Sequence, residues 1–97
     1  MKISWIKKEN SENLILFFGG FASDENLLES FDFGDNDVLM FCDYADFDAE
    51  IPNEIFEYSK VGVIAWSFGV WVADFLEERL PRADLRIAPV SYTHLRA

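Results

Sequence analysis

Residues 65–69, Ala-Trp-Ser-Phe-Gly, contain the side chain of this sequence that is best suited to covalent chemistry. An unbroken apolar run at residues 61–66 leads directly to Ser67, and a helix-like pattern follows it. A serine on a sharp turn between a buried strand and a helix has its hydroxyl lifted clear of the backbone. Small residues must flank such a turn, because the strand and the helix approach closely there. Ala65 and Gly69 meet this need, so the pattern predicts a nucleophile elbow with Ala65 where a glycine usually stands.

The position of Ser67 at the start of a predicted helix has two interpretations. The free backbone N–H groups and the dipole of a helix N-terminus stabilise negative charge, as the developing oxyanion of an ester requires. The same position also suits a serine that only caps the helix. Spacing alone leaves both interpretations open.

A second feature is the pair Gly19 and Gly20, which follows the apolar run at residues 14–18. A glycine-rich turn after a buried strand can aim a backbone N–H at a reacting carbonyl oxygen. Where a nucleophile elbow is present, one such donor is the residue after the nucleophile and the other comes from this kind of loop. We therefore predict the N–H groups of Phe21 and Phe68 as the oxyanion hole. A plain strand-to-helix turn is the alternative, although the order of the two features favours the catalytic interpretation.

A catalytic serine needs a histidine base, and His94 is the only histidine in the sequence. With a nucleophile elbow the chain order is serine, then acid, then histidine, with further strands between them. His94 follows Ser67 too closely for that order, and no acidic residue follows Asp84. His94 is therefore a poor candidate for the base.

The elements that must position these residues can be read from the apolar pattern. Short apolar runs bounded by turn residues predict strands that are buried on both faces. Strands are predicted at residues 14–18, 38–42 and 61–66, with a weaker one at 2–6 and another beginning at 85–88; helices are predicted at 24–30, capped by Ser23, and at 53–58 and 70–80. Alternating strands and helices indicate an α/β fold, with helices on both faces of a mostly parallel sheet in a three-layer sandwich. The sheet is short of strands for a complete fold of this class.

Composition and charge restrict the class of protein. With 51% hydrophobic residues in 97, the sequence forms a core and excludes intrinsic disorder. The net charge is −10, and no Lys or Arg occurs between Glu9 and Ser59, so a nucleic-acid partner is excluded. No apolar run approaches the ~20 residues that cross a bilayer, and no signal-peptide core is present. We expect a cytoplasmic protein without a membrane partner.

No metal and no cofactor are predicted. The single cysteine, Cys42, excludes an intramolecular disulfide and a cysteine metal cluster. The acidic residues have no metal-ligand spacing and are expected to lie on a solvated surface. The glycine turn is not followed by the Gly-Lys-Ser/Thr of a P-loop, and no dinucleotide fingerprint is met.

Residues 14–22, 41–44 and 65–71 resemble the BioG-type pimeloyl-acyl-carrier-protein methyl ester esterases, which are α/β-hydrolases of biotin synthesis. The likeness is specific, because the Phe-rich Gly-Gly turn and the Trp-Ser-x-Gly elbow occur together. It implies a serine esterase that removes the methyl group from the pimeloyl chain, with Ser67 as nucleophile. Phe21 and Phe68 would supply the oxyanion N–H groups, and Trp66 would line the acyl pocket. The implied partner is the acyl-carrier protein that carries the substrate.

The resemblance also implies what these 97 residues lack. The acid, the histidine and the cap region of the family lie in a C-terminal portion that has no counterpart here. We therefore expect residues 1–88 to be a partial domain, the N-terminal half of an α/β-hydrolase, that is inactive alone. Residues 89–97 resemble a translated sequencing-adapter remnant, in which case His94 has no biological meaning. The alternatives are another small α/β-hydrolase, acting on a different ester or thioester, and a non-catalytic α/β module with Ser67 as a helix cap.

Overall fold

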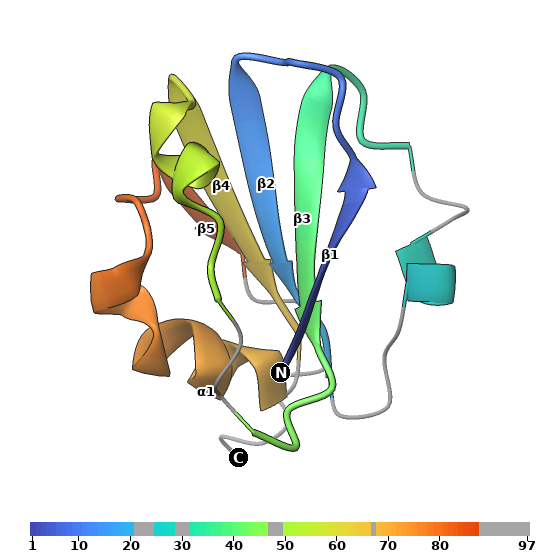
Figure 1. Cartoon of the computed structure of the whole chain (residues 1–97), viewed down its shortest axis with the longest axis vertical. Helices are drawn as coiled ribbons and strands as arrows, with labels where there is room; N and C mark the ends of the chain where they lie inside the picture. The colour runs from blue at the N-terminus through green and yellow to red at the C-terminus, as the bar shows by residue number, and fades with distance from the viewer. Residues whose placement is uncertain (21–24, 29–31, 47–49, 67, 88–97) are drawn as a thin grey trace.

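The computed structural model describes residues 1–20, 25–28, 32–46, 50–66 and 68–87. Five strands form one sheet in the order β1-β3-β2-β4-β5 (Figure 1). The strands are β1 (Lys2–Lys7), β2 (Asn13–Phe18), β3 (Asn36–Cys42), β4 (Lys60–Ala65) and β5 (Leu85–Ile87). The helical elements are α1 (Phe68–Phe75) and the short 3-10 turns η1 (Glu25–Leu28), η2 (Asn53–Glu57) and η3 (Glu77–Arg79).

The sheet is mostly parallel, which agrees with the prediction of a mixed α/β fold. β2 pairs in parallel with β3 and β4, and β4 pairs in parallel with β5. Only β1 runs antiparallel, along the outer side of β3. The carboxyl ends of β2, β3 and β4 therefore lie at one edge of the sheet, beside α1 (Figure 1). β4, the strand that leads to Ser67, is an inner strand of the sheet, paired with β2 on one side and β5 on the other.

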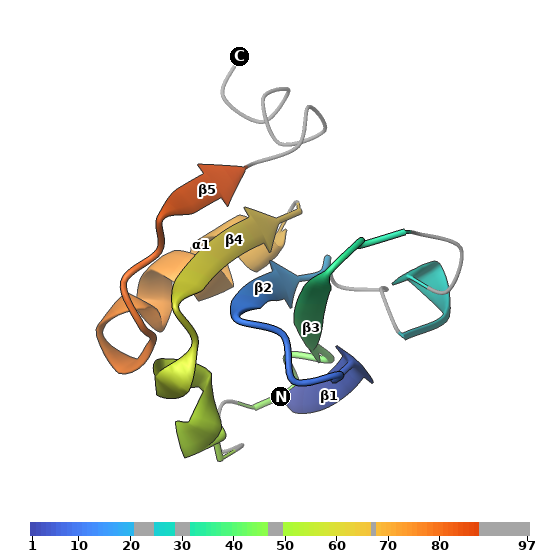
Figure 2. The same cartoon turned by 90° about the horizontal axis from the view of Figure 1, so that it is seen from above.

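β2 and β3 are buried on both faces, which explains why these strands have unbroken apolar sequences. α1 and η2 lie on one face, and η1 lies on the other (Figure 2). The larger core cluster, on the α1 face, includes Leu16, Phe18, Phe41, Ile55, Val63 and Val72. The rings of Phe18 and Phe41 stack in this cluster, with their centroids 4.4 Å apart. The smaller cluster, on the η1 face, consists of Phe17, Leu28, Val38, Met40 and Cys42.

The helical elements are shorter than the sequence predicts. The helix predicted at residues 70–80 begins earlier, at Phe68, and its regular part ends at Phe75, after which η3 continues as a 3-10 turn. Tightening of the last turn into a 3-10 helix is common at helix ends. The other two predicted helices are the 3-10 turns η1 and η2, and Ser23 lies outside the described residues. Among the described residues η1 alone covers the second face, so the three-layer sandwich stays a prediction.

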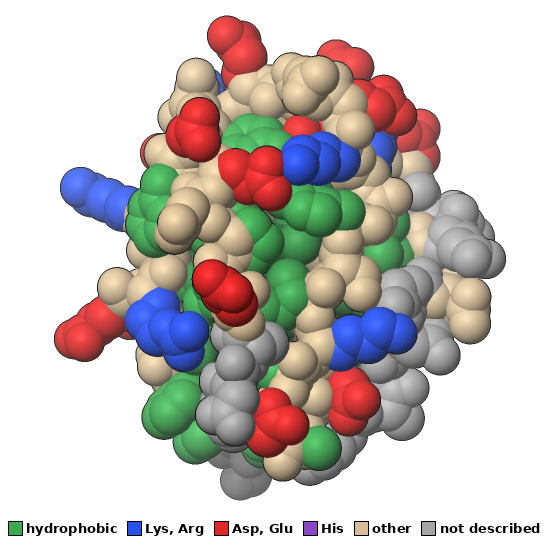
Figure 3. Space-filling model, viewed as in Figure 1, with side chains coloured by type: hydrophobic (Ala, Val, Ile, Leu, Met, Phe, Trp, Pro, Cys, Tyr) green, Lys and Arg blue, Asp and Glu red, His purple; other side chains and the backbone are tan. Residues whose placement is uncertain are grey.

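Apolar side chains stay visible in the middle of the α1 face, between acidic groups (Figure 3). The exposed large apolar residues of the chain include Phe56, Trp66, Trp71, Phe75, Leu85 and Ile87. None of the helices in the described part of the chain is both long and apolar enough to span a membrane.

Candidate active site

The connection from β4 to α1 is as short as a nucleophile elbow requires. β4 ends at Ala65 and α1 begins at Phe68, so only Trp66 and Ser67 lie between them. The Trp66 N–H donates to the Phe18 carbonyl oxygen at 2.9 Å, which continues the pairing of β4 with β2. The Gly69 N–H then donates to the Trp66 carbonyl oxygen at 2.9 Å. Ser67 itself lies outside the described residues, so the position of its hydroxyl stays a prediction.

Gly69 lies where no other residue fits. A Cβ atom at this position would come within 2.2 Å of the Phe18 carbonyl oxygen and 2.7 Å of the Gly19 carbonyl oxygen. Both obstacles are backbone atoms, which cannot rotate away as a side chain can. The first turn of α1 therefore packs directly on the end of β2. This is the close approach of helix and strand for which an elbow needs its small residue.

Gly19 and Gly20 are buried directly after β2. The Gly19 N–H donates to the Phe41 carbonyl oxygen at 3.0 Å, so the turn begins attached to β3. Of the two predicted oxyanion donors, Phe21 lies outside the described residues, whereas Phe68 is the half-buried first residue of α1. The first N–H groups of a helix have no acceptor within the helix. The next residue, Gly69, packs on the Gly19 carbonyl oxygen, so the start of α1 lies beside the glycine turn, but the pair of donors stays a prediction.

The sequence pattern assigns no role to Tyr44, although this residue lies within residues 41–44 of the resemblance. Its side chain is buried, and its hydroxyl is 2.8 Å from both the Gly19 and the Phe41 carbonyl oxygens. Its ring packs at an angle on the ring of Phe68, with the centroids 5.7 Å apart. Burial, together with the nearby Cys42, raises the pKa of Tyr44, so the phenol keeps its proton and acts as a donor.

Aromatic side chains lie at the connection from β4 to α1 and along α1. Trp66 is 41% exposed. Along α1 the ring of Phe68 stacks on Trp71, and Trp71 stacks on Phe75, with centroid distances of 5.5 Å and 5.2 Å. Apolar rings next to the connection from β4 to α1 are suited to contact a hydrocarbon chain. The assignment of Trp66 to an acyl pocket stays a prediction.

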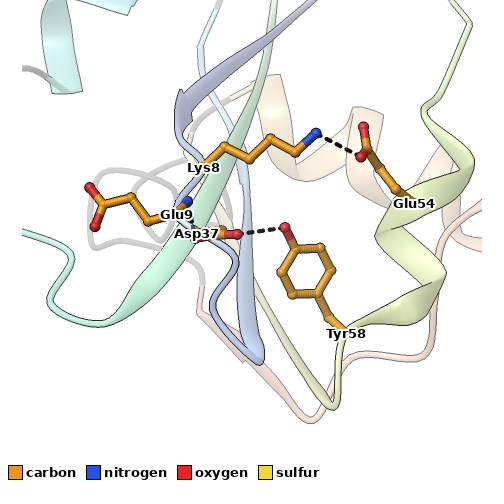
Figure 4. Close-up of polar contacts among 5 residues, drawn as sticks. All are labelled: Lys8, Glu9, Asp37, Glu54 and Tyr58. Carbon is orange, nitrogen blue, oxygen red and sulfur yellow. Dashed lines mark hydrogen bonds and ion pairs between the residues drawn. The ribbon is translucent and has the colours of Figure 1, made fainter.

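The prediction that the acidic residues lie on a solvated surface is wrong for Asp37, at the opposite end of the sheet. Asp37, in β3, is fully buried. One oxygen of its carboxylate accepts the Glu9 and Ser11 N–H groups at 2.9 Å and 3.4 Å. The other accepts the Tyr58 hydroxyl at 2.6 Å (Figure 4). Burial opposes ionisation, but the hydrogen bonds from Tyr58, Glu9 and Ser11 outweigh it, and the pKa of Asp37 is lowered.

The carboxylate of Asp37 accepts three hydrogen bonds within the fold, so its role is structural. The described residues form no group of three or more His, Cys, Asp or Glu that could hold a metal ion. His94 lies outside those residues. At the connection from β4 to α1 the structure brings together the side chains of Tyr44 and Phe68, beside the backbone of Gly19 and Gly69.

Comparison with known proteins gives consistent results. The family model described as pimeloyl-ACP methyl esterase BioG matches residues 1–87. A Haemophilus influenzae protein that is described only as uncharacterized is 33% identical over 64 residues, which are 65% of this chain and 29% of that protein. The crystal structure of BioG from Haemophilus influenzae superposes with a TM-score of 0.76 at 27% identity. That match covers 91% of this chain and 40% of the solved chain, so the sequence spans less than half the length of either relative.

Proposed function

The chain belongs to the BioG family of pimeloyl-ACP methyl esterases, and on that premise we propose that it carries the nucleophile of such an esterase. The substrate is the methyl ester of pimeloyl-acyl-carrier protein, and the reaction releases methanol during biotin synthesis. Ser67 is the nucleophile, and Phe21 and Phe68 supply the oxyanion N–H groups. The fold that holds them is the N-terminal half of an α/β-hydrolase, formed by residues 1–88, with residues 89–97 as a tail outside it.

The reaction has two steps. In the first, a base takes the hydroxyl proton of Ser67 while its Oγ attacks the ester carbonyl carbon, and the carbonyl oxygen becomes an oxyanion. The N–H groups of Phe21 and Phe68 stabilise that charge. Methanol leaves with the proton from the base, which gives an acyl-enzyme. In the second step the same base takes a proton from water, which attacks the acyl-enzyme; the pimeloyl carboxylate forms, and the proton from the base restores the Ser67 hydroxyl.

The observation that carries this proposal is the contact of Gly69 with the end of β2. A serine that merely caps a helix needs no such contact, because a cap requires only a side-chain oxygen near the first N–H groups. A nucleophile elbow needs it, because the helix must start against the neighbouring strand. A Cβ atom added at Gly69 would lie 2.2 Å from the Phe18 carbonyl oxygen, and this tight packing favours the elbow over the cap.

The substrate part of the proposal relies on the family and on the aromatic surface. Trp66 is placed next to the nucleophile in the sequence and is 41% exposed, so its ring is available to the acyl chain. The acyl-carrier protein is the proposed partner, because it carries the ester. The catalytic acid and base are not assigned to residues of this sequence, and we propose that they lie in a region beyond these 97 residues.

The test of the nucleophile is Ser67→Ala in the full-length protein. Hydrolysis of pimeloyl-acyl-carrier-protein methyl ester should fall about 10³-fold or more, since a methyl group cannot attack a carbonyl carbon. The melting temperature should change little. The matched control is Ser59→Ala, which removes an exposed hydroxyl just before the start of β4 and leaves the backbone bond from Ser59 N–H to Glu12 intact. Turnover by Ser67→Ala at the rate of Ser59→Ala would refute the assignment.

A second test concerns residues 1–97 expressed alone. We expect no ester hydrolysis, because serine without a base is a weak nucleophile, and an oxyanion hole alone leaves only ~10³-fold over water. We also expect aggregation, since β5 exposes Leu85 and Ile87 at the edge of the sheet. The measurements are size-exclusion chromatography, thermal melting and a p-nitrophenyl ester assay. A cooperatively folding monomer whose ester turnover disappears on His94→Ala would contradict both expectations.

A further inference from the structure

Tyr44 contacts both segments to which the proposed function assigns the oxyanion hole. Its hydroxyl is 2.8 Å from the carbonyl oxygen of Gly19, two residues before Phe21. Its ring lies against the ring of Phe68, whose N–H is the other proposed donor. The same hydroxyl is 2.8 Å from the carbonyl oxygen of Phe41, at the end of β3. One buried side chain thus connects the glycine turn, β3 and the start of α1.

The glycine turn requires a connection of this kind. Glycine reaches more backbone conformations than any other residue, so two glycines in succession do not fix the direction of the next peptide group. An oxyanion hole stabilises charge only when its donors point at the oxygen before the reaction begins. Because a peptide unit is planar, a hydrogen bond that fixes the Gly19 carbonyl also fixes the direction of the Gly20 N–H. Only the dihedral angles of Gly20 then remain between this fixed plane and Phe21.

Tyrosine is well suited to this position. Its rigid ring spans the distance from the β3 end to the glycine turn with only two rotatable bonds. The hydroxyl has one proton, which the two carbonyl oxygens share, so no charge enters the site. The raised pKa of Tyr44 keeps that proton in place over the working pH range of an esterase.

We propose that Tyr44 is a positioning residue that holds the glycine turn and the first residue of α1 in the geometry of the oxyanion hole. This inference rests on the proposed function, because it presupposes that the two segments supply the donors. Tyr44 touches neither the substrate nor the reacting atoms in this role. It acts through Gly19 and Phe68.

The test is Tyr44→Phe in the full-length protein, which keeps the ring against Phe68 and removes only the hydroxyl. Loss of an entire oxyanion donor lowers kcat by about 10²–10³-fold, and a donor that is present but poorly aimed should cost about 10-fold to 100-fold. KM should stay within about twofold, since a ground-state ester makes little use of the hole. A boronic acid inhibitor, which forms the tetrahedral adduct, should lose affinity by the same factor as kcat.

The matched control is Tyr58→Phe. It also removes a tyrosine hydroxyl that donates a hydrogen bond to a buried acceptor, but at the opposite end of the sheet. It should lower the melting temperature and leave kcat unchanged. An equal loss of kcat in both variants would overturn the proposal, because general loss of stability would then explain it. Unchanged kcat in Tyr44→Phe would overturn it too.

Two further variants separate the remaining outcomes. Ser67→Ala is assayed in parallel: if it retains turnover, the proposed function fails and the role of Tyr44 fails with it. If Ser67→Ala is inactive while Tyr44→Phe is fully active, only the positioning role fails. Should Tyr44→Phe not fold, Phe68→Leu tests the same connection from α1, since it keeps the N–H and removes the ring contact. A lower kcat at constant KM supports the proposal, and an unchanged kcat overturns it.

Discussion

The two ends of the sheet each contain a tyrosine whose hydroxyl donates to a buried acceptor, but the acceptors differ. At the carboxyl end Tyr44 meets the backbone carbonyls of Gly19 and Phe41. At the amino end Tyr58 meets the carboxylate of Asp37. A backbone carbonyl does not titrate, so the hydrogen bonds of Tyr44 stay the same at any pH at which the protein is folded. A buried carboxylate holds several N–H and O–H groups at once, but only while it is charged.

This difference separates the requirements of chemistry from those of stability. In the proposed esterase the carboxyl end must present backbone N–H groups at fixed positions, and neutral hydrogen bonds hold them without a negative charge that would repel the oxyanion. The amino end has only to join the turn between β1 and β2 to β3 and η2, so a charged hub is acceptable there. The predictions below change one end at a time, starting with the largest expected effect.

The largest effect is expected at the carboxyl end, from Gly69→Ala. The added methyl would lie 2.2 Å from the Phe18 carbonyl oxygen, so α1 must move away from β2. Overpacking typically costs about 1–3 kcal/mol and occasionally more, and we expect a loss at or above the top of that range because the obstacles are backbone atoms that cannot rotate away. We expect no soluble folded protein, measured by expression yield and thermal melting.

The matched control is Gly62→Ala in β4, where the nearest atom to a new Cβ is the Leu85 carbonyl oxygen at 3.9 Å. That distance is ordinary van der Waals contact, so this variant should fold. If both alanine variants melt at the temperature of the unmodified protein, the tight packing of α1 on β2 is wrong.

A smaller effect is expected at the amino end, from Asp37→Asn. The neutral amide keeps an acceptor but loses the charge, and a hydrogen bond to a buried charged group contributes about 1.5–3 kcal/mol. We expect the free energy of unfolding at pH 7 to fall by about 2 kcal/mol, measured by urea denaturation. Activity per folded molecule should not change, because this end does not form the proposed site.

The pH dependence of that loss identifies its origin. The pKa of Asp37 is lowered in the folded state from its ordinary value of 3.8. Its charge therefore stabilises the fold above the unfolded pKa, and this contribution disappears as the pH falls through the folded pKa. The difference between the unmodified protein and Asp37→Asn should be constant from pH 7 to about 5 and shrink below about pH 4. A difference that stays constant down to pH 2 would mean that the charge of Asp37 contributes nothing.

Much of the carboxyl end could be predicted from local sequence. The apolar runs at residues 14–18 and 61–66 coincide with β2 and β4 to within a residue, because strands buried on both faces leave a continuous apolar pattern. The requirement for a small residue at Gly69 follows from the same local argument, and the contact with Phe18 is its physical reason. The placement of Ser67 and Phe21 stays a prediction.

The amino end and Tyr44 could not be predicted in this way, because their partners are distant in the chain. Asp37 is 21 positions from Tyr58 and 28 from Glu9, and nothing in the local pattern distinguishes it from the surface acids. Tyr44 is 25 positions from Gly19, and it lies in an acidic segment without a regular apolar pattern. The order of the strands also depends on pairing between segments that are distant in the chain, so the local pattern does not give it.

The smallest effect is expected from an exposed ion pair at the amino end. Comparing it with Asp37 tests whether burial explains the larger contribution of Asp37 to stability. Lys8 Nζ lies 2.7 Å from a Glu54 carboxylate oxygen, and both side chains are more than 40% exposed. The same ammonium lies 4.9 Å from the centre of the Trp5 ring. Exposed pairs of this kind contribute about 0.2–1 kcal/mol, and salt screens them. Glu54→Gln should therefore lower the free energy of unfolding by less than about 1 kcal/mol in low salt, with the difference vanishing near 1 M NaCl. A loss as large as that of Asp37→Asn, and insensitive to salt, would show that burial does not explain the difference between the two carboxylates.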